Sequence, residues 1–326
     1  MKKPLFFFLL FTILLSCKKA ENINYDYFLD DEWNNAVHQL GLGQVVGLDI
    51  ASNGDIVVFH RAGRMWTEPF PEENIENNTI AIIDSQSGKI KKSWGKNLFS
   101  MPHGLTVDHY DNVWVTDVGR HQVFKFNAKG ELLMMLGEER MPGVDALHFD
   151  QPTDIAISEV DSSVYISDGY GNSRVVKYNY QGKYLLDFGS KGNGKGLFNL
   201  PHGITIDPED IIYVADRENS RVQSFDAKGN FLKVWDDKSY GKVYSVAYNH
   251  KEKVLLAVDY KTNLALFPVG SDIIFLKNDG SYTSKIGRSG NYEGKPLRYH
   301  DLAIDNNGYI YIGDILENQL IRYKKK

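Results

Sequence analysis

The stretch Leu200-Pro201-His202-Gly203-Ile204-Thr205-Ile206-Asp207 decides the fold, because the sequence repeats its pattern along the whole chain. Clear copies begin at Met101, Gln151 and Tyr299, and weaker copies begin at Val46 and Tyr244. A polar turn and a second apolar strand follow each copy, and this strand ends in aspartate in all but the first copy, which ends in His60. These aspartates are Asp117, Asp168, Asp216, Asp259 and Asp314.

A third strand and often a fourth complete each repeat, as in Gln122 to Phe126 followed by Glu131 to Leu136. The period-two alternation and the glycine turns predict strands rather than helices. Four short strands every 40 to 55 residues or so are typical of propeller blades. The repeats resemble NHL repeats, so we predict an all-β, six-bladed NHL β-propeller over residues 25–326. A β-solenoid is the alternative that fits less well.

The last repeat ends after three strands, at Tyr323. Closing the ring would remove the exposed strand edges that an open sheet leaves. We therefore expect a segment within about Tyr25 to Leu42 to supply part of the closure.

The N-terminus predicts export and lipid anchoring. A basic start precedes an apolar run from Leu5 to Leu15, which is too short to span a bilayer and is typical of a signal peptide. It ends in Leu14-Leu15-Ser16-Cys17, the pattern of a bacterial lipobox. We expect a signal peptide over residues 1–17, a lipid on Cys17 and a tether over residues 18–24. An ordinary cleavage site beside a chance cysteine is the alternative.

These features predict an exported bacterial lipoprotein on the periplasmic or cell-surface face of a membrane, which it contacts through the anchor only. Cys17 is the single cysteine, so the mature domain has no disulfide and depends on its core. The net charge of -5 gives no sign of a nucleic-acid partner. We expect a monomer.

Three histidines occupy equivalent positions in alternate repeats. The first strand of a blade lies beside the central channel, so equivalent positions form a ring around one mouth. The position before the Gly/Asp-Leu/Ile pair holds, in order, Val46, His103, Thr153, His202, Tyr244 and His300. Imidazoles in every second blade predict a His₃ metal site with an open coordination position, which suits zinc, iron or copper. The alternative is that Pro-His-Gly is only a turn.

The turns after the second strands open on the same face. Arg61 and Arg217 occupy equivalent places there, and arginine binds carboxylates in a two-pronged fashion. Tyr170 could act as a base if nearby cations or a metal lower its pKa. Each of these residues could instead serve its own loop. We expect the recurring aspartates to be structural and to bind turn amides.

Longer runs carry a more specific resemblance, and they occur in order along nearly the whole mature chain. They include Val58-Phe59-His60-Arg61, Pro102-His103-Gly104-Leu105, Trp114-Val115-Thr116-Asp117-Val118, Gln151-Pro152-Thr153-Asp154, Ser167-Asp168-Gly169-Tyr170 and Ala215-Asp216-Arg217-Glu218-Asn219. In these runs the chain resembles the peptidyl-α-hydroxyglycine α-amidating lyases, the lyase part of peptidylglycine α-amidating monooxygenase.

The resemblance implies that the chain cleaves the carbon–nitrogen bond of a peptidyl-α-hydroxyglycine, or a related carbinolamide, to an amide and glyoxylate. It places zinc on His103, His202 and His300. It makes Tyr170 the base, sets Arg61 at the substrate carboxylate and adds Arg217 to the active site. It also implies a structural calcium held by Asp301 and the backbone carbonyls of Leu48 and Leu105.

Three departures qualify the resemblance. The family's Met-Pro before the third histidine is Arg298-Tyr299 here, so we expect a new cation near the mouth. The cysteine that animal enzymes carry beside the tyrosine is Gly171, and blade five, Lys242 to Ile286, resembles the family least.

Two other functions remain open from sequence. One is a non-catalytic NHL propeller lipoprotein that binds a peptide, glycan or protein partner, since a fold alone does not fix function. The other is a metal-dependent, lactonase-like hydrolase, although such a site would favour carboxylate or asparagine ligands over this histidine ring.

Overall fold

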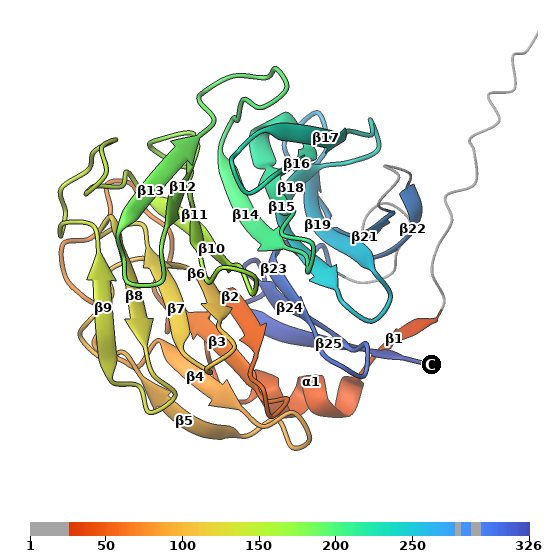
Figure 1. Cartoon of the computed structure of the whole chain (residues 1–326). Coiled ribbons are helices and arrows are strands. Elements are labelled where there is room, and N and C mark those ends of the chain that lie inside the picture. Colours follow the sequence, from red (N-terminus) through yellow and green to blue (C-terminus); the bar gives the residue numbers. More distant parts are fainter. Residues whose placement is uncertain (1–25, 278–281, 288–294) are drawn as a thin grey trace, which may run out of the picture.

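The computed structural model describes residues 26–277, 282–287 and 295–326, which form a ring of six antiparallel sheets around a central channel (Figure 1). This confirms the predicted all-β, six-bladed propeller. The predicted signal peptide, Cys17 and the tether over residues 18–24 lie outside the described residues. No helix in the described part of the chain is both long enough and apolar enough to cross a bilayer.

Each blade begins with its innermost strand and proceeds outward. Blade one contains β2 (Val45–Ile50), β3 (Ile56–His60), β4 (Ile80–Ile83) and β5 (Ile90–Trp94). Blade two contains β6 (Pro102–Val107), β7 (Val113–Asp117), β8 (Gln122–Phe126) and β9 (Leu132–Leu136). Blade three contains β10 (Pro152–Ile157), β11 (Val164–Asp168), β12 (Arg174–Tyr178) and β13 (Tyr184–Phe188).

The other three blades follow the same order, with two additions. Blade four contains β14 (Pro201–Ile206), β15 (Ile212–Asp216), β16 (Arg221–Phe225) and β17 (Phe231–Trp235), with a 3₁₀ turn, η1 (Arg217–Asn219). Blade five contains β18 (Lys242–Asn249), β19 (Val254–Thr262), β21 (Asp272–Leu276) and β22 (Tyr282–Gly287), and β20 (Pro268–Gly270) pairs with β19. Blade six contains β23 (Tyr299–Ile304), β24 (Ile310–Asp314), β25 (Gln319–Lys325) and β1 (Tyr27–Leu29).

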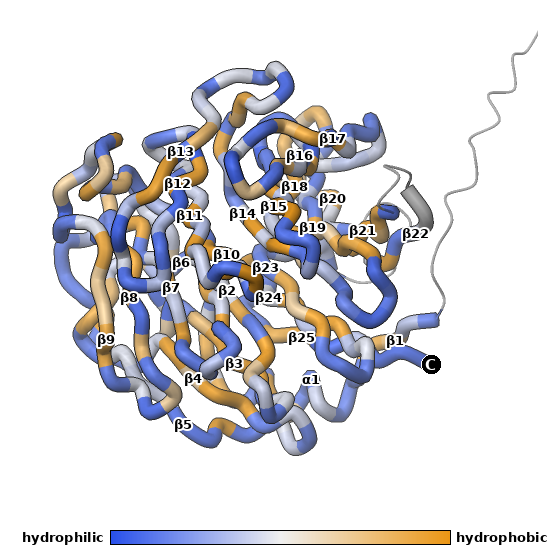
Figure 2. The backbone as a smooth tube through the Cα atoms, viewed as in Figure 1, coloured by the Kyte–Doolittle hydropathy of each residue, from blue (hydrophilic) through white to orange (hydrophobic). Residues whose placement is uncertain are grey.

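The core lies between the faces of neighbouring blades. Second strands such as β7 are buried along their whole length, whereas the outermost strand β9 alternates between exposed and half-buried residues. Between blades one and two, for example, Phe59, Phe99 and Phe124 pack edge to face, with centroids 4.8 and 5.1 Å apart. Figure 2 shows the hydrophobic residues gathered in the strands and the hydrophilic ones in the turns.

The N-terminal segment closes the ring, as predicted. β1 adds to the outer edge of β25, so that Tyr27 lies opposite Lys325 and Leu29 opposite Tyr323. A helix that the sequence analysis did not anticipate, α1 (Asp31–His38), follows directly. Its buried Trp33 and Val37 are four residues apart and therefore share one helix face, which packs against blades one and six.

A β-bulge interrupts all six innermost strands where they enter the channel. The register shifts fall between Val45 and Gly47, Pro102 and Leu105, Pro152 and Asp154, Pro201 and Gly203, Val243 and Ser245, and Tyr299 and Asp301. Each interval contains the position that holds histidine in alternate blades. Because a bulge redirects a side chain, this shared irregularity turns the ring residues toward the channel. The glycine after His103 fits here because a Cβ on Gly104 would lie 2.3 Å from the Thr153 carbonyl oxygen.

The recurring aspartates fix the entrance of each innermost strand. All five are fully buried, and each accepts a backbone N–H from the segment that leads into that strand. The donors are Ser100 for Asp117, Asp150 for Asp168, Asn199 for Asp216, Gly241 for Asp259 and Arg298 for Asp314, at 2.6–2.9 Å. This confirms their predicted structural role.

Candidate metal centre and active-site mouth

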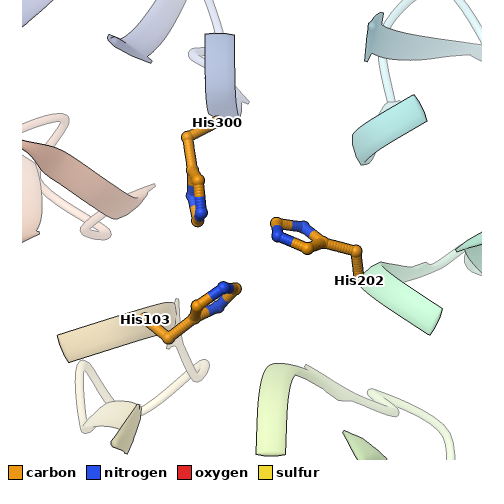
Figure 3. A group of neighbouring side chains, drawn as sticks. All are labelled: His103, His202 and His300. Atoms are coloured by element: carbon orange, nitrogen blue, oxygen red, sulfur yellow. The ribbon is translucent and has the colours of Figure 1, made fainter. Parts of the chain in front are cut away.

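The imidazoles of His103, His202 and His300 converge on the channel axis from β6, β14 and β23. Their ring centroids lie 4.7–4.8 Å apart, and one ligand atom of each lies within 4.8 Å of the others. Figure 3 shows the three rings turned toward one another from three separate strands. The structure therefore brings together the three residues that sequence spacing selected, and all three are buried.

Backbone carbonyls hold each imidazole in a single orientation. The Nδ1 atoms of His103, His202 and His300 lie 2.7 Å from the carbonyl oxygens of Thr153, Tyr244 and Val46, which are the ring residues of the next blades. A carbonyl oxygen can only accept, so Nδ1 carries the proton and the Nε2 lone pair is left for a ligand. Burial, reinforced by neighbouring charges, lowers the pKa of all three histidines well below 6.5.

Three neutral imidazoles that direct their Nε2 lone pairs toward a common point fit a zinc ion, which takes three protein nitrogens and leaves a fourth position open. The donor set contains no carboxylate among the described residues within this cluster. The residues therefore suit the metal predicted from sequence better than they suit calcium or magnesium, which prefer oxygen ligands.

Tyr170 places its hydroxyl directly against this cluster. Its oxygen lies 3.1 Å from His103 Nε2 and 3.3 Å from His202 Nε2. Arg217, in η1, donates an N–H to it from Nη1 at 3.2 Å. Burial raises the pKa of Tyr170, while the charges of Arg217 and Arg61 act in the opposite direction. The predicted lowering by cations is therefore present but is outweighed by burial.

Arg61 is buried at the mouth with part of its guanidinium unpaired. Its side chain is 1% exposed. Nε donates to the Pro102 carbonyl at 3.1 Å and Nη1 donates to Gln44 Oε1 at 2.7 Å. Nη2 has no hydrogen-bond partner among the described residues. A buried donor without a partner is costly, so this group is placed to receive an anionic ligand.

Trp66 also belongs to the mouth, and sequence reasoning missed it. It lies in the long connection between β3 and β4, where its ring packs against Tyr170 at an interplanar angle of 36°, with centroids 5.1 Å apart. The Arg61 guanidinium lies 5.1 Å from the centroid of the same ring. This connection has no counterpart in the other repeats, so the repeat pattern gave no guide to it. The only sequence signal was one of five tryptophans placed just after Arg61.

The residues proposed for calcium line the channel beyond the histidines. Asp301, Leu48 and Leu105 border the same cavity. Asp301 accepts the Leu48 N–H at 2.8 Å and the Ser245 hydroxyl at 2.7 Å, and burial raises its pKa to about 7. The Asp301 carboxylate thus already serves the neighbouring innermost strands.

Comparison with known proteins identifies the family. A family model for the NHL repeat matches residues 99–126 and 198–225. A Drosophila melanogaster protein named peptidyl-alpha-hydroxyglycine alpha-amidating lyase 2 is 34% identical over 310 residues, covering 89% of this chain and 72% of the relative. This chain belongs to the peptidyl-α-hydroxyglycine α-amidating lyase family. Membership confirms the resemblance and the expected enzyme class, a lyase.

Two further relatives match this chain over different shares of their length. A probable peptidyl-alpha-hydroxyglycine alpha-amidating lyase of Caenorhabditis elegans is 43% identical over 199 residues, covering 57% of this chain and 56% of the relative. Peptidyl-glycine alpha-amidating monooxygenase B of Xenopus laevis is 34% identical over 325 residues, covering 94% of this chain. The chain spans 37% of the length of that monooxygenase.

Solved structures resemble the amidating lyase fold at low sequence identity. A streptogramin B lyase superposes with a TM-score of 0.57 at 13% identity, covering 92% of this chain and 98% of the other. A gluconolactonase from Xanthomonas campestris gives a TM-score of 0.60 at 11% identity, covering 88% of each chain. These likenesses concern the propeller alone, so they do not favour a lactonase-like activity.

Proposed function

We propose that this chain cleaves the carbon–nitrogen bond of a peptide ending in α-hydroxyglycine and releases the peptide amide and glyoxylate. Family membership supports the reaction class. The observation that carries the proposal is the buried Arg61, whose unpaired Nη2 shares one mouth with Tyr170 and the histidine cluster. This combination suits a substrate that bears a carboxylate beside a hydroxyl group.

We propose zinc as the ion held by His103, His202 and His300. Bound there, it would act as a Lewis acid that favours ionisation of the substrate hydroxyl. The neutral imidazoles and their carbonyl-fixed orientation support this assignment. A structural calcium at Asp301, with Leu48 and Leu105, remains a second proposal, supported by the position of these residues in the channel.

The side chains then have distinct roles. Arg61 binds the glycine carboxylate and fixes the carbinol carbon beside Tyr170. Tyr170 acts as the phenolate, which the N–H of Arg217 stabilises, and it becomes a phenol when it takes the hydroxyl proton. The carbon–oxygen double bond of glyoxylate forms as the carbon–nitrogen bond breaks, and the same proton passes to the leaving nitrogen. The sum is one carbinolamide converted to one amide and one aldehyde, with no other reactant.

The test is glyoxylate release from α-hydroxyhippurate by the purified full chain. We expect release that a chelator abolishes and zinc restores, and that His202→Ala abolishes even with zinc. His148→Ala is the matched control, because His148 is an outer histidine bonded to Asp145 and Glu138. A folded, zinc-loaded protein that releases no glyoxylate would refute the proposal and favour a non-catalytic binding propeller.

We also propose that Cys17 carries a lipid that holds the exported chain on a membrane surface. The lipobox sequence supports this proposal. Labelling with a radioactive fatty acid in a bacterial host should mark the wild-type chain and not Cys17→Ala. Equal labelling of the two proteins would contradict it.

A further inference from the structure

Arg298 places a third guanidinium at the mouth, beside Tyr244. Arg298 lies two residues before His300 and directly precedes β23. Its Cζ atom lies 5.2 Å from the ring centroid of Tyr244 and 4.9 Å from that of Tyr260. Its Nε and Nη2 atoms both donate to the Tyr244 hydroxyl oxygen, Nε at 3.0 Å. Two tyrosines thus hold this cation in place.

The same tyrosine connects Arg298 to the histidine cluster. The Tyr244 ring lies 4.8 Å from the His202 ring and 5.8 Å from the His300 ring, measured between centroids. Its other neighbour is Arg217, whose Cζ lies 5.1 Å from the Tyr244 centroid. Arg298 therefore lies one aromatic ring away from the centre where the substrate hydroxyl is proposed to bind.

No carboxylate of the described residues forms an ion pair with Arg298. Asp314, the nearest acidic partner that it contacts, accepts only its backbone N–H. Arg217 is paired with Glu218, at 2.9 Å from Nη2, whereas the buried Arg61 also has no ion pair within the described ranges. Among the residues that the structure describes, the mouth thus presents two guanidiniums without a counter-ion, and one substrate carboxylate would neutralise only one of them.

We infer that Arg298 and the Tyr244 hydroxyl form a second anion-binding subsite, which selects substrates with an acidic residue immediately before the α-hydroxyglycine. This inference rests on the proposed function. Arg61 contacts the blade-two side of the mouth through Pro102, and Arg298 contacts blade five through Tyr244. When the terminal carboxylate of a substrate lies at Arg61, its carbinol lies at the histidines. The residue before the α-hydroxyglycine then lies along another side of the mouth, where Arg298 and Tyr244 can reach it.

The chemistry of the subsite favours a carboxylate. A guanidinium forms directional, charge-assisted hydrogen bonds to carboxylate oxygens, and the Tyr244 hydroxyl has its own proton left to donate. Tyr244 and Tyr260 already restrict the Arg298 guanidinium before a ligand binds, so binding costs little further side-chain entropy. An uncharged side chain of the same shape would leave the Arg298 guanidinium without a counter-ion. The subsite would therefore bind an acidic substrate more tightly than its uncharged analogue.

The test compares N-acetyl-glutamyl-α-hydroxyglycine with N-acetyl-glutaminyl-α-hydroxyglycine, a pair that differs in charge and hardly in size. For the wild type we expect kcat/KM to favour the glutamyl substrate by about ten- to a hundredfold. Arg298→Met should bring this ratio close to one. Lys295→Met, which removes the same charge from a side chain that is 77% exposed and paired with Glu317, should retain it.

A binding measurement separates this inference from the proposed function. Calorimetry with N-acetyl-glutamylglycine and its glutaminyl counterpart needs no cleavage, because these peptides lack the hydroxyl group. Tighter binding of the glutamyl peptide that Arg298→Met removes, together with no glyoxylate release from the two hydroxylated substrates, would support the subsite and overturn the lyase proposal. Rapid turnover by the wild type with equal kcat/KM for the two hydroxylated substrates would overturn the subsite alone. This measurement uses only the wild type, so it does not depend on the folding of a variant.

Discussion

The Tyr170 hydroxyl contacts His103, His202 and Arg217, so its removal tests the proposed proton transfer directly. We expect Tyr170→Phe to lower kcat about 10²- to 10⁴-fold, the usual contribution of a positioned acid–base group. The variant should still bind zinc, because the three imidazoles keep their backbone partners. Steady-state glyoxylate release and the zinc content of the purified protein measure the two effects.

The matched control is Tyr110→Phe, which removes a hydroxyl from a side chain that is 64% exposed. It should leave kcat within about twofold of the wild type, as expected for a surface substitution. Activity of Tyr170→Phe equal to that of this control would exclude Tyr170 as the base.

His60 gives a second prediction at the level of a single residue, this time about pH. Its Nδ1 lies 2.7 Å from the Leu42 carbonyl oxygen, and burial lowers its pKa from 6.5 to about 4. His60 therefore takes up a proton near pH 6.5 in the unfolded chain but only near pH 4 in the folded chain. The stability contributed by neutral His60 is present above pH 6.5 and is lost as the pH falls to 4, a change of about 3 kcal/mol.

Urea unfolding of the wild type and of His60→Gln at a series of pH values isolates this contribution. Between pH 7 and pH 4, the free energy of unfolding of the wild type should fall by about 3 kcal/mol relative to that of His60→Gln. A constant difference for His60→Gln would show that His60 takes up its proton at the same pH in the folded protein as in the unfolded chain.

Among the elements, the closure of the ring by β1 and α1 carries the clearest stability prediction. Trp33 is 3% exposed and packs edge to face on Tyr311, 5.6 Å between centroids, while Arg322 covers its other side at 4.5 Å. We expect Trp33→Ala to lower the free energy of unfolding by about 3–5 kcal/mol, because it opens a large cavity where the first and last blades meet. Chemical denaturation measures this loss.

Phe28→Ala provides the comparison within the same N-terminal segment. Phe28 is on β1 but is 46% exposed, so its truncation should cost less than about 1 kcal/mol. Similar losses for Phe28→Ala and Trp33→Ala would mean that the helix contact does not secure the closure.

The elements also show how far the sequence could predict the fold. Repeated alternation located second strands such as β7, β11 and β15 and the aspartates at which they end, because each blade repeats the same buried pattern. It could not predict α1, which is a single helix of eight residues without a repeat, held by tertiary contacts of Trp33 and Val37. It also missed β20, which belongs to an extension of blade five that the other blades lack.

At the scale of the whole molecule, the histidine cluster joins blades two, four and six. Metal bound there would favour the closed ring over every opened form, since the unfolded chain lacks the site. We expect zinc at a hundred times its dissociation constant to stabilise the wild type by about 2.7 kcal/mol, and so to raise its Tm by several degrees. Calorimetric scans with chelator and with zinc measure the shift.

His202→Ala should lose this thermal shift, and His148→Ala should keep it. Stabilisation of the His202 variant by as much as the wild type would place the ion elsewhere in the molecule.

The site could be predicted from sequence only as far as the symmetry of the ring extends. Equivalence between repeats was enough to bring His103, His202 and His300 together, because the shared bulge turns the same position inward in each blade. Trp66 lies in a connection unique to blade one, so no repeat could indicate its place over Tyr170. The unpaired Nη2 of Arg61 depends on packing between blades, which no local pattern encodes.

The layer of residues beneath the histidines bears on the order in which the products of the proposed reaction would leave. The space between them and the layer of Asp154, Ser245 and Asp301 is a cavity of about 10 Å³, roughly room for one water molecule. A space of this size is too small for glyoxylate, so in the proposed reaction both products would leave through the mouth. Glyoxylate would form at the histidines and leave after the bulkier amide, so it should compete directly with fresh substrate, whereas the amide should not.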